Sequence, residues 1–200
     1  MTLVVVTKTV LPDRIREAIA AGVTIIGENR VQEALSKRDE VGEGVAWHLV
    51  GTLQRNKARH AVRLFDLIHS VDALPLAEAL EAAAAKADKR QEVLVEVKIS
   101  PEETKAGVLP DDLPGLLEAL ASLPHLRVKG LMGIAPLLDV AERSRPYFRR
   151  LRALFDEARG RRSGSDMTHL SMGMSSDFEV AVEEGATMVR VGTAIFGARG

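Results

Sequence analysis

The sequence contains no cysteine, and aromatic residues make up only 4% of its 200 residues. Without cysteine there is neither a disulfide framework nor a thiolate for catalysis or metal binding. The formal net charge is −1, so no overall charge favours nucleic acid or an anionic membrane. No apolar run is long enough to span a bilayer, and no signal-peptide pattern precedes the first predicted strand. We therefore expect a cytoplasmic protein that binds neither membranes nor nucleic acid.

The remaining composition is that of an ordinary globular protein. Hydrophobic residues make up 46% of the chain and charged residues 28%. A chain of this length, folded as one domain, buries roughly 70% of the surface of its unfolded state. We therefore predict a single domain over residues 1–200.

Two hydrophobic periods alternate along the chain. Helical spacing, as at Ile15, Ala18 and Ile19, separates short apolar runs that are typical of buried parallel strands. These runs cover residues 3–7, 23–27, 46–51, 67–71, 92–100, 128–134, 168–172 and 188–192. Eight strands alternating with helices predict an α/β fold of the (β/α)8 TIM-barrel type. An open doubly wound sheet is the alternative.

One arginine-rich stretch, "RSRPYFRRLRALFDEARGRR", resembles a nucleic-acid-binding segment at first sight. Its apolar residues Leu151, Leu154, Phe155 and Ala158 fall on one helical face. The pattern therefore favours an amphipathic helix whose basic face is solvated.

Polar residues collect where the predicted strands end, which is the rim where TIM barrels carry their active sites. They are Lys8, Glu28, Asn29, His48, Ser70, Asp72, Lys98, Ser100, His169, Ser171 and Arg190. Contact with water explains most polar strand ends. It explains Lys8 and Arg190 less well, because strand alternation allows each of these side chains to point into the barrel.

Two loops have the composition of a phosphate site, and TIM barrels often bind phosphate after strands 7 and 8. Gly192 and Thr193 follow the last predicted strand, where a hydroxyl and backbone N–H groups can bind an anion. The preceding loop offers Ser171, Gly173 and Ser175 in "HLSMGMSSDFEVA". An ordinary capped helix explains this loop equally well. Ser175 or Ser176 would be its N-cap, and Ser176 has capping-box spacing with Glu179.

A lysine after strand 1 and a phosphate site after strands 7 and 8 together match pyridoxal 5′-phosphate (PLP). Its aldehyde condenses with a lysine amine, and its phosphate needs hydrogen-bond donors. We therefore predict PLP as the cofactor.

Seven stretches, in order and over nearly the whole chain, resemble the pyridoxal phosphate homeostasis protein family. They are "VVVTKT", "GENRVQEA", "WHLVGTLQRNK", "IHSVD", "ETKAGV", "GLMGIAP" and "LSMGMSSDFEVAVEEGATMVRVGTAIFGAR". Members of that family usually carry a helical segment before the first strand, and here the sequence starts with the strand itself.

The resemblance implies a barrel similar to the cofactor domain of alanine racemase. It implies that Lys8 carries the cofactor as a Schiff base, that Asn29 lies near the ring and that Arg190 faces the pyridine nitrogen. It assigns the phosphate to Ser171, Gly192 and Thr193. Lys57 and Lys105 match recurrent family lysines with no assigned role. The implied function is to carry and buffer PLP, with effects on amino-acid and keto-acid balance. We expect a monomer, with apo-forms of PLP-dependent enzymes as acceptors.

The residues themselves also favour a carrier over an enzyme. Arginine stays protonated, so at the pyridine nitrogen Arg190 disfavours the protonated ring that withdraws electrons best. Racemisation needs a second acid/base on the opposite face of the substrate, and the only tyrosine, Tyr147, lies in the sixth helical segment, away from the rim. The alternatives are a low-activity racemase or decarboxylase, and a metal-dependent hydrolase built on His48, His69, His169 and Asp72.

Overall fold

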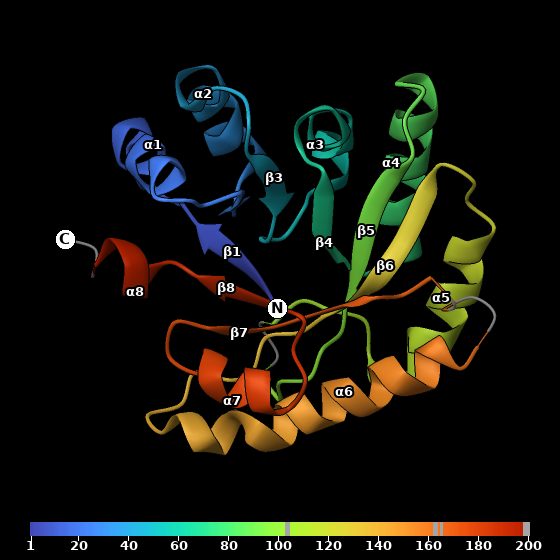
Figure 1. Ribbon diagram of the computed structural model, residues 1–200. Coiled ribbons are helices and arrows are strands. Elements are labelled where there is room, and N and C mark those ends of the chain that lie inside the picture. Colours follow the sequence, from blue (N-terminus) through green and yellow to red (C-terminus); the bar gives the residue numbers. More distant parts are fainter. Residues whose placement is uncertain (103–104, 162–163, 165, 198–200) are drawn as a thin grey trace.

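The computed structural model describes residues 1–102, 105–161, 164 and 166–197, and it has the predicted (β/α)8 architecture. Eight parallel strands close into a barrel in chain order, with β8 hydrogen-bonded to both β7 and β1 (Figure 1). The strands are β1 (Thr2–Val6), β2 (Ile25–Glu28), β3 (Ala46–Leu49), β4 (Leu67–Val71), β5 (Gln91–Glu96), β6 (Leu126–Met132), β7 (His169–Met174) and β8 (Met188–Val191).

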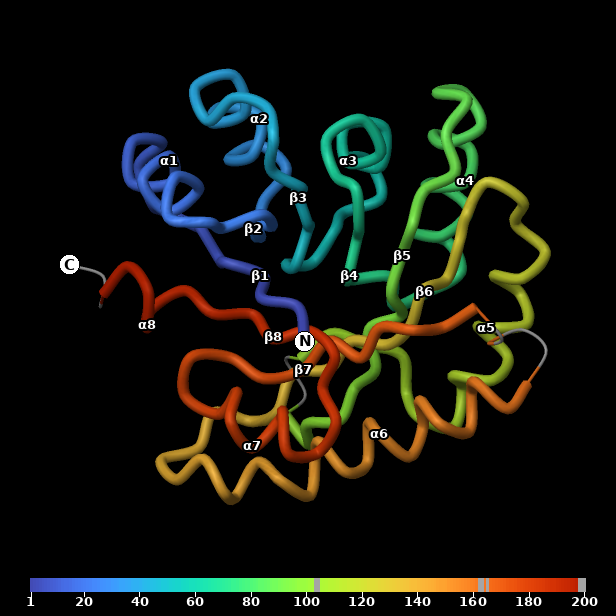
Figure 2. The backbone as a smooth tube through the Cα atoms, viewed as in Figure 1, coloured from blue at the N-terminus to red at the C-terminus, as the bar shows by residue number. Residues whose placement is uncertain are grey.

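Helices lie outside the strands, α1 to α4 on one side of the barrel and α6 and α7 on the opposite side (Figure 2). They are α1 (Pro12–Ala20), α2 (Val31–Val41), α3 (Ala58–Leu64), α4 (Leu74–Lys86), α5 (Leu113–Ala121), α6 (Arg145–Arg159), α7 (Phe178–Glu183) and α8 (Thr193–Phe196). Three 3₁₀ helices precede α3, α5 and α6: η1 (Arg55–Lys57), η2 (Pro110–Asp112) and η3 (Ala141–Ser144).

Several strands end earlier than their apolar runs predict. β1 ends at Val6 and β5 at Glu96, so Lys8, Lys98 and Ser100 lie in the loops beyond the barrel. The apolar pattern continues into these loops because Val97 and Ile99 are also buried. After β5, Val97 also forms an isolated parallel bridge with Val108, so burial and this short pairing together explain the extra length of that run.

The main hydrophobic core lies between the strands and the helices and includes Trp47, Phe65 and Phe148. The barrel interior has a smaller apolar layer formed by Leu67, Leu94, Met132 and Met188. Two residues further along β4, β5 and β8, on the same face of each strand, come polar side chains instead. The part of the barrel interior nearer the carboxyl ends of the strands holds His48, His69, Glu96, Ser171 and Arg190, each at most 5% exposed.

Helix α6 agrees with the interpretation of the arginine-rich stretch. Its residues Leu151, Phe155 and Ala158 are buried in the core. Arg145 forms ion pairs with Glu142, Glu183 and Glu184, and further arginines of this segment pair with nearby carboxylates. In the part of the chain that the structure describes, no helix has the length and apolar character needed to cross a membrane.

Helix α2 departs in one respect from the apolar spacing of its own sequence. Apolar spacing places Val31, Ala34 and Leu35 on its buried face. Val31 and Ala34 are buried, whereas Leu35 is 44% exposed and Lys37 is buried in its place. The apolar pattern fails here because Lys37 finds two carboxylate partners inside the protein.

Candidate functional site

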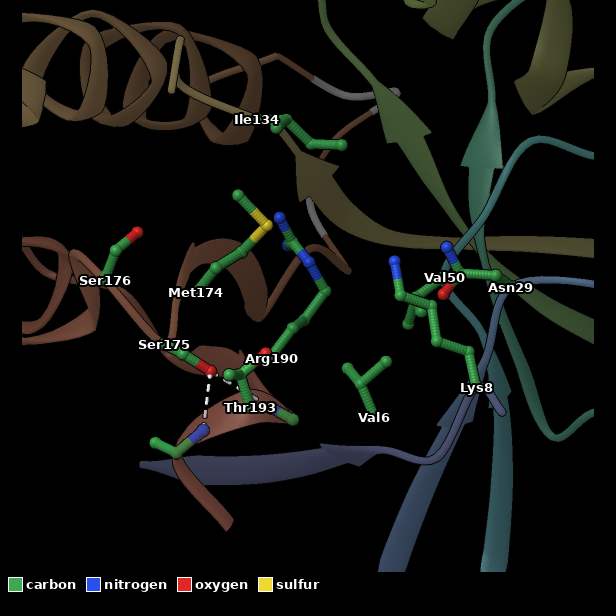
Figure 3. A pocket seen from close by; sticks show the side chains of 12 residues that line it. Val6, Lys8, Asn29, Val50, Ile134, Met174, Ser175, Ser176, Arg190 and Thr193 are labelled. Carbon is green, nitrogen blue, oxygen red and sulfur yellow. Dashed lines mark hydrogen bonds between the residues drawn. The ribbon is translucent and has the colours of Figure 1, made fainter. Parts of the chain in front are cut away.

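A cavity of about 540 Å³ opens at the carboxyl ends of β1, β2, β7 and β8 (Figure 3). It contains five of the six predicted site residues: Lys8, Asn29, Arg190, Gly192 and Thr193. The rest of its lining is Val6, Val50, Ile134, Met174, Ser175, Ser176 and Ala194. The sequence prediction included Ser175 as a candidate and missed the apolar walls, although strand alternation places Val6 on the same side as Val4.

Lys8 lies two residues beyond the end of β1 and is half-buried. Its amine projects into the cavity across from Arg190 (Figure 3). Lys8 thus takes the inward direction that strand alternation allows, although the residue belongs to the turn after the strand. A lysine amine directed into a cavity is suited to react with the carbonyl group of a bound molecule.

Arg190 extends from β8 across the barrel interior. One of its nitrogens donates to the Ser171 hydroxyl at 2.6 Å, and another donates to the Gly133 carbonyl at 3.0 Å. Burial lowers the pKa of Arg190 to about 10, which leaves the guanidinium charged at neutral pH. These bonds fix a cation at the inner wall of the cavity.

Ser171 is fully buried and does not line the cavity. Its hydroxyl accepts from Arg190 and lies 3.0 Å from Nδ1 of His69, whose Nε2 lies 3.1 Å from Nδ1 of His48. The structure therefore places Ser171 in a chain of hydrogen bonds behind Arg190. The sequence prediction had placed it at the rim. The difference arises because β7 continues to Met174, three residues past Ser171, so Ser171 lies inside the barrel and not at the strand end.

The two histidines in this chain of hydrogen bonds, His48 and His69, are neutral at physiological pH. Burial lowers the pKa of His48 to about 4 and that of His69 well below its ordinary value. A histidine whose pKa is lower in the fold than in the unfolded chain stabilises the fold above the unfolded value of 6.5, and that stability is lost as pH falls towards 4.

We expect the free energy of unfolding to drop by about 3 kcal/mol across this window because of His48 alone. In urea titrations at pH 7 and pH 4, His48→Gln should show a smaller drop than the original protein. His60→Gln, which replaces an exposed histidine, is the control variant. An unchanged drop in His48→Gln would contradict a neutral, buried His48.

The loops after β7 and β8 meet at Ser175. The backbone N–H groups of Gly192 and Ala194 both donate to its hydroxyl, at 3.2 and 3.3 Å (dashed lines in Figure 3). Only glycine suits position 192, because a Cβ atom there would lie 2.9 Å from the carbonyl oxygen of Val6. Two backbone donors and a hydroxyl therefore converge at one edge of the cavity, where an anion can take the place of the Ser175 oxygen as the acceptor of both N–H groups.

The capping box predicted for Ser176 and Glu179 is wrong. Helix α7 begins only at Phe178, after Asp177, and no side chain caps it. The Asp177 carboxylate accepts instead from the N–H of Met174 at 2.7 Å and closes the turn. Because Asp177 closes the turn, Ser175 is available to contact the β8 loop.

Asn29 follows β2 directly and contributes an amide to the cavity. Its Oδ1 atom is buried and has no hydrogen-bond partner among the described residues. The loop after β3 packs closely against it, since a Cβ atom on Gly51 would lie 2.4 Å from the Asn29 carbonyl oxygen. A buried acceptor without a partner is costly, so this atom is suited to a ligand that donates a hydrogen bond.

The two lysines without assigned roles lie outside the cavity. Lys57 belongs to η1 and lines a neighbouring hollow of about 690 Å³ that it shares with Asn29. Lys105 lies 3.9 Å from the Glu102 carboxylate, in an ion pair beyond β5.

The metal-site hypothesis finds no matching geometry. His48 and His69 bond to each other, and within residues 1–102, 105–161, 164 and 166–197 no three histidine, aspartate or glutamate side chains are grouped to hold a metal ion.

The fold and the site together define a class of protein. Residues 3–200 match the family model for the N-terminal domain of alanine racemase. An alanine racemase structure from Clostridium difficile has the same fold, with a TM-score of 0.74 over 100% of this chain and 52% of its own, at 15% identity. The chain is thus an alanine-racemase-type barrel.

Two curated relatives are much more similar. Pyridoxal phosphate homeostasis proteins from Aquifex aeolicus and Pseudomonas aeruginosa are 48% and 44% identical, over 96% and 98% of this chain and 84% of each relative. The structure of PipY from Synechococcus elongatus PCC7942 with PLP bound is 44% identical, with a TM-score of 0.93 over 98% of this chain and 92% of its own. The chain belongs to the pyridoxal phosphate homeostasis protein family.

Proposed function

We propose that this protein binds PLP in the 540 Å³ cavity and carries and buffers the cofactor for the cell. The observation that carries the proposal is the presence of a lysine amine, a fixed arginine and converging backbone donors in one cavity. The family and the PLP-bound relative support the same cofactor.

The residues of the cavity fit the three polar parts of PLP. Lys8 would hold the cofactor through its aldehyde, with loss of water, and the cofactor would supply an electron-withdrawing ring. The N–H groups of Gly192 and Ala194, with the hydroxyls of Ser175 and Thr193, bind the phosphate. Arg190 donates to the pyridine nitrogen, and Asn29 contacts the ring substituents. Ser171 takes a supporting role here, because its hydroxyl holds Arg190.

Two features favour a carrier over an enzyme. Arg190 remains a cation near neutral pH, so it disfavours protonation of the ring nitrogen and restrains carbanion chemistry. Tyr147 is partly buried against the core from α6 and does not line the cavity, so it offers no second acid/base for racemisation.

The open rim of the cavity suits release of the cofactor. Ser176, Thr193 and Ala194 line the cavity and are exposed to solvent. We propose that apo-forms of PLP-dependent enzymes accept the cofactor from this rim. A low-activity racemase or decarboxylase is the alternative function.

A transfer assay separates the two functions. The PLP-loaded protein should restore activity to an apo-enzyme that depends on PLP, while its own turnover of common amino acids stays far below about 10 per second, the median for enzymes. Alanine and glutamate enantiomers are followed by chiral chromatography, with free PLP at the same concentration as the control for transfer. Turnover near that median on any amino acid would contradict the carrier function.

A further inference from the structure

A cluster of three charged side chains, two of them buried and the third partly buried, lies directly behind the turn that carries Lys8. Lys37 of α2 is 7% exposed, and its amine donates to Glu28 at 2.9 Å and to Glu33 at 2.6 Å. Glu28 comes from the end of β2 and is fully buried. None of these three side chains lines the cavity.

The cluster binds the chain on both sides of Lys8. On one side, Lys37 donates to the carbonyl oxygen of Thr7 at 2.7 Å, and the Thr7 hydroxyl donates to Glu28 at 2.7 Å. On the other side, the backbone N–H of Thr9 donates to the Glu33 carboxylate. Lys8 is therefore held between two residues whose backbone or side-chain groups bond to the same cluster.

Thr9 shows that this turn is held against its own preference. Its φ angle is +63°, in the left-handed region that β-branched residues rarely adopt. Such a conformation persists only where surrounding contacts impose it. The bond from the Thr9 N–H to Glu33 is a contact that does so.

The cluster is a costly way to fill this space. Two charges are taken from water and a third is partly shielded from it, and one oxygen of Glu28 has no partner among the described side chains and backbone groups. Burial raises the pKa of Glu28, and bonds from Thr7 and Lys37 oppose that rise. Apolar residues of similar volume often stabilise a fold equally well at such a place, and in some proteins buried charged groups serve instead to specify one geometry.

We propose that Lys37, with Glu28 and Glu33, acts as a set of positioning residues that fixes the Thr7–Thr9 turn, so that the Lys8 amine points into the cavity at the reach of a bound aldehyde. The proposal rests on the proposed function, because it assumes that Lys8 forms the Schiff base. It adds three residues that act through the backbone of Lys8 and do not themselves contact the cofactor.

The test compares Glu33→Ala and Lys37→Met with the unchanged protein. The rate of Schiff-base formation after mixing with PLP is followed by absorbance and by borohydride trapping. Affinity is measured in parallel for pyridoxamine 5′-phosphate, which keeps the ring and phosphate but has no aldehyde. Displacement of a reacting group by about 1 Å can cost about a hundredfold in rate. We therefore expect Schiff-base formation to slow by about tenfold or more, with pyridoxamine phosphate affinity changed by less than about threefold.

Glu40→Ala is the matched control, because Glu40 is an exposed glutamate on the same helix with no side-chain bond to the turn. Glu33→Gln keeps an acceptor oxygen for Thr9 and should retain more of the rate than Glu33→Ala. Lys37→Met leaves the buried Glu28 without its cation, so the folding of this variant is checked by circular dichroism. If Lys37→Met does not fold, the result for Glu33→Ala alone decides the test.

The outcomes separate this inference from the function on which it rests. Folded variants that react at the original rate would overturn the positioning role. Equal losses in reaction rate and in pyridoxamine phosphate affinity would also overturn it, because the cluster would then support the whole site. Failure of the unchanged protein to form a Schiff base on Lys8 would instead refute the proposed function.

Discussion

Replacing Lys8 with alanine is expected to abolish the absorbance of the Schiff base near the violet edge of the visible spectrum, while PLP binding persists. The amine is the part of the cavity that reacts with the aldehyde, so no other lining residue can replace it. The contacts assigned to the phosphate and to the ring nitrogen do not involve Lys8. Binding of PLP to Lys8→Ala is measured by fluorescence or equilibrium dialysis.

Borohydride reduction followed by peptide mapping identifies the labelled lysine in the unchanged protein. The label should lie on Lys8. Lys57→Ala is the matched control, because Lys57 lines the adjacent hollow and shares Asn29 with it, yet lies outside the cavity. A label found on Lys57 or Lys105 alone would reject the assignment of Lys8.

Removing the phosphate from the ligand is expected to weaken binding by about a thousandfold or more. Hydrogen bonds to charged groups contribute about 1.5 to 3 kcal/mol each, and about 1.4 kcal/mol corresponds to a tenfold change in affinity. Several donors converge where Ser175 meets Gly192 and Ala194, so the summed effect exceeds about 4 kcal/mol. Affinities of PLP and pyridoxal for Lys8→Ala are compared, which removes the contribution of the Schiff base.

The same site can be tested from the protein side. Ser175→Ala removes one hydroxyl from the loop junction and should weaken PLP binding by about tenfold to a hundredfold, with pyridoxal binding little changed. Ser122→Ala, at the exposed end of α5, is the matched control. Equal affinity for PLP and pyridoxal in the original protein would show that the phosphate is not bound at this junction.

The barrel and most of the cavity were predictable from local patterns. Strand and helix periods depend on neighbouring residues, so eight apolar runs were enough to indicate eight strands. The carboxyl ends of parallel strands meet on one rim, so Lys8, Asn29, Arg190 and Gly192 could be placed together before their distances were known.

Only the tertiary structure decided the roles that depend on contacts between distant segments. Ser171 bonds to His69 across a sequence separation of 102 residues, and its hydroxyl also accepts from Arg190. These two contacts hold Ser171 behind the cavity, whereas Ser175 lines the cavity. Lys37 is buried although the helical pattern favoured Leu35, because its partner Glu28 ends a different strand. Residue spacing shows the apolar period of a single helix or strand. Whether a charged side chain is buried depends instead on which partner a different helix or strand places beside it.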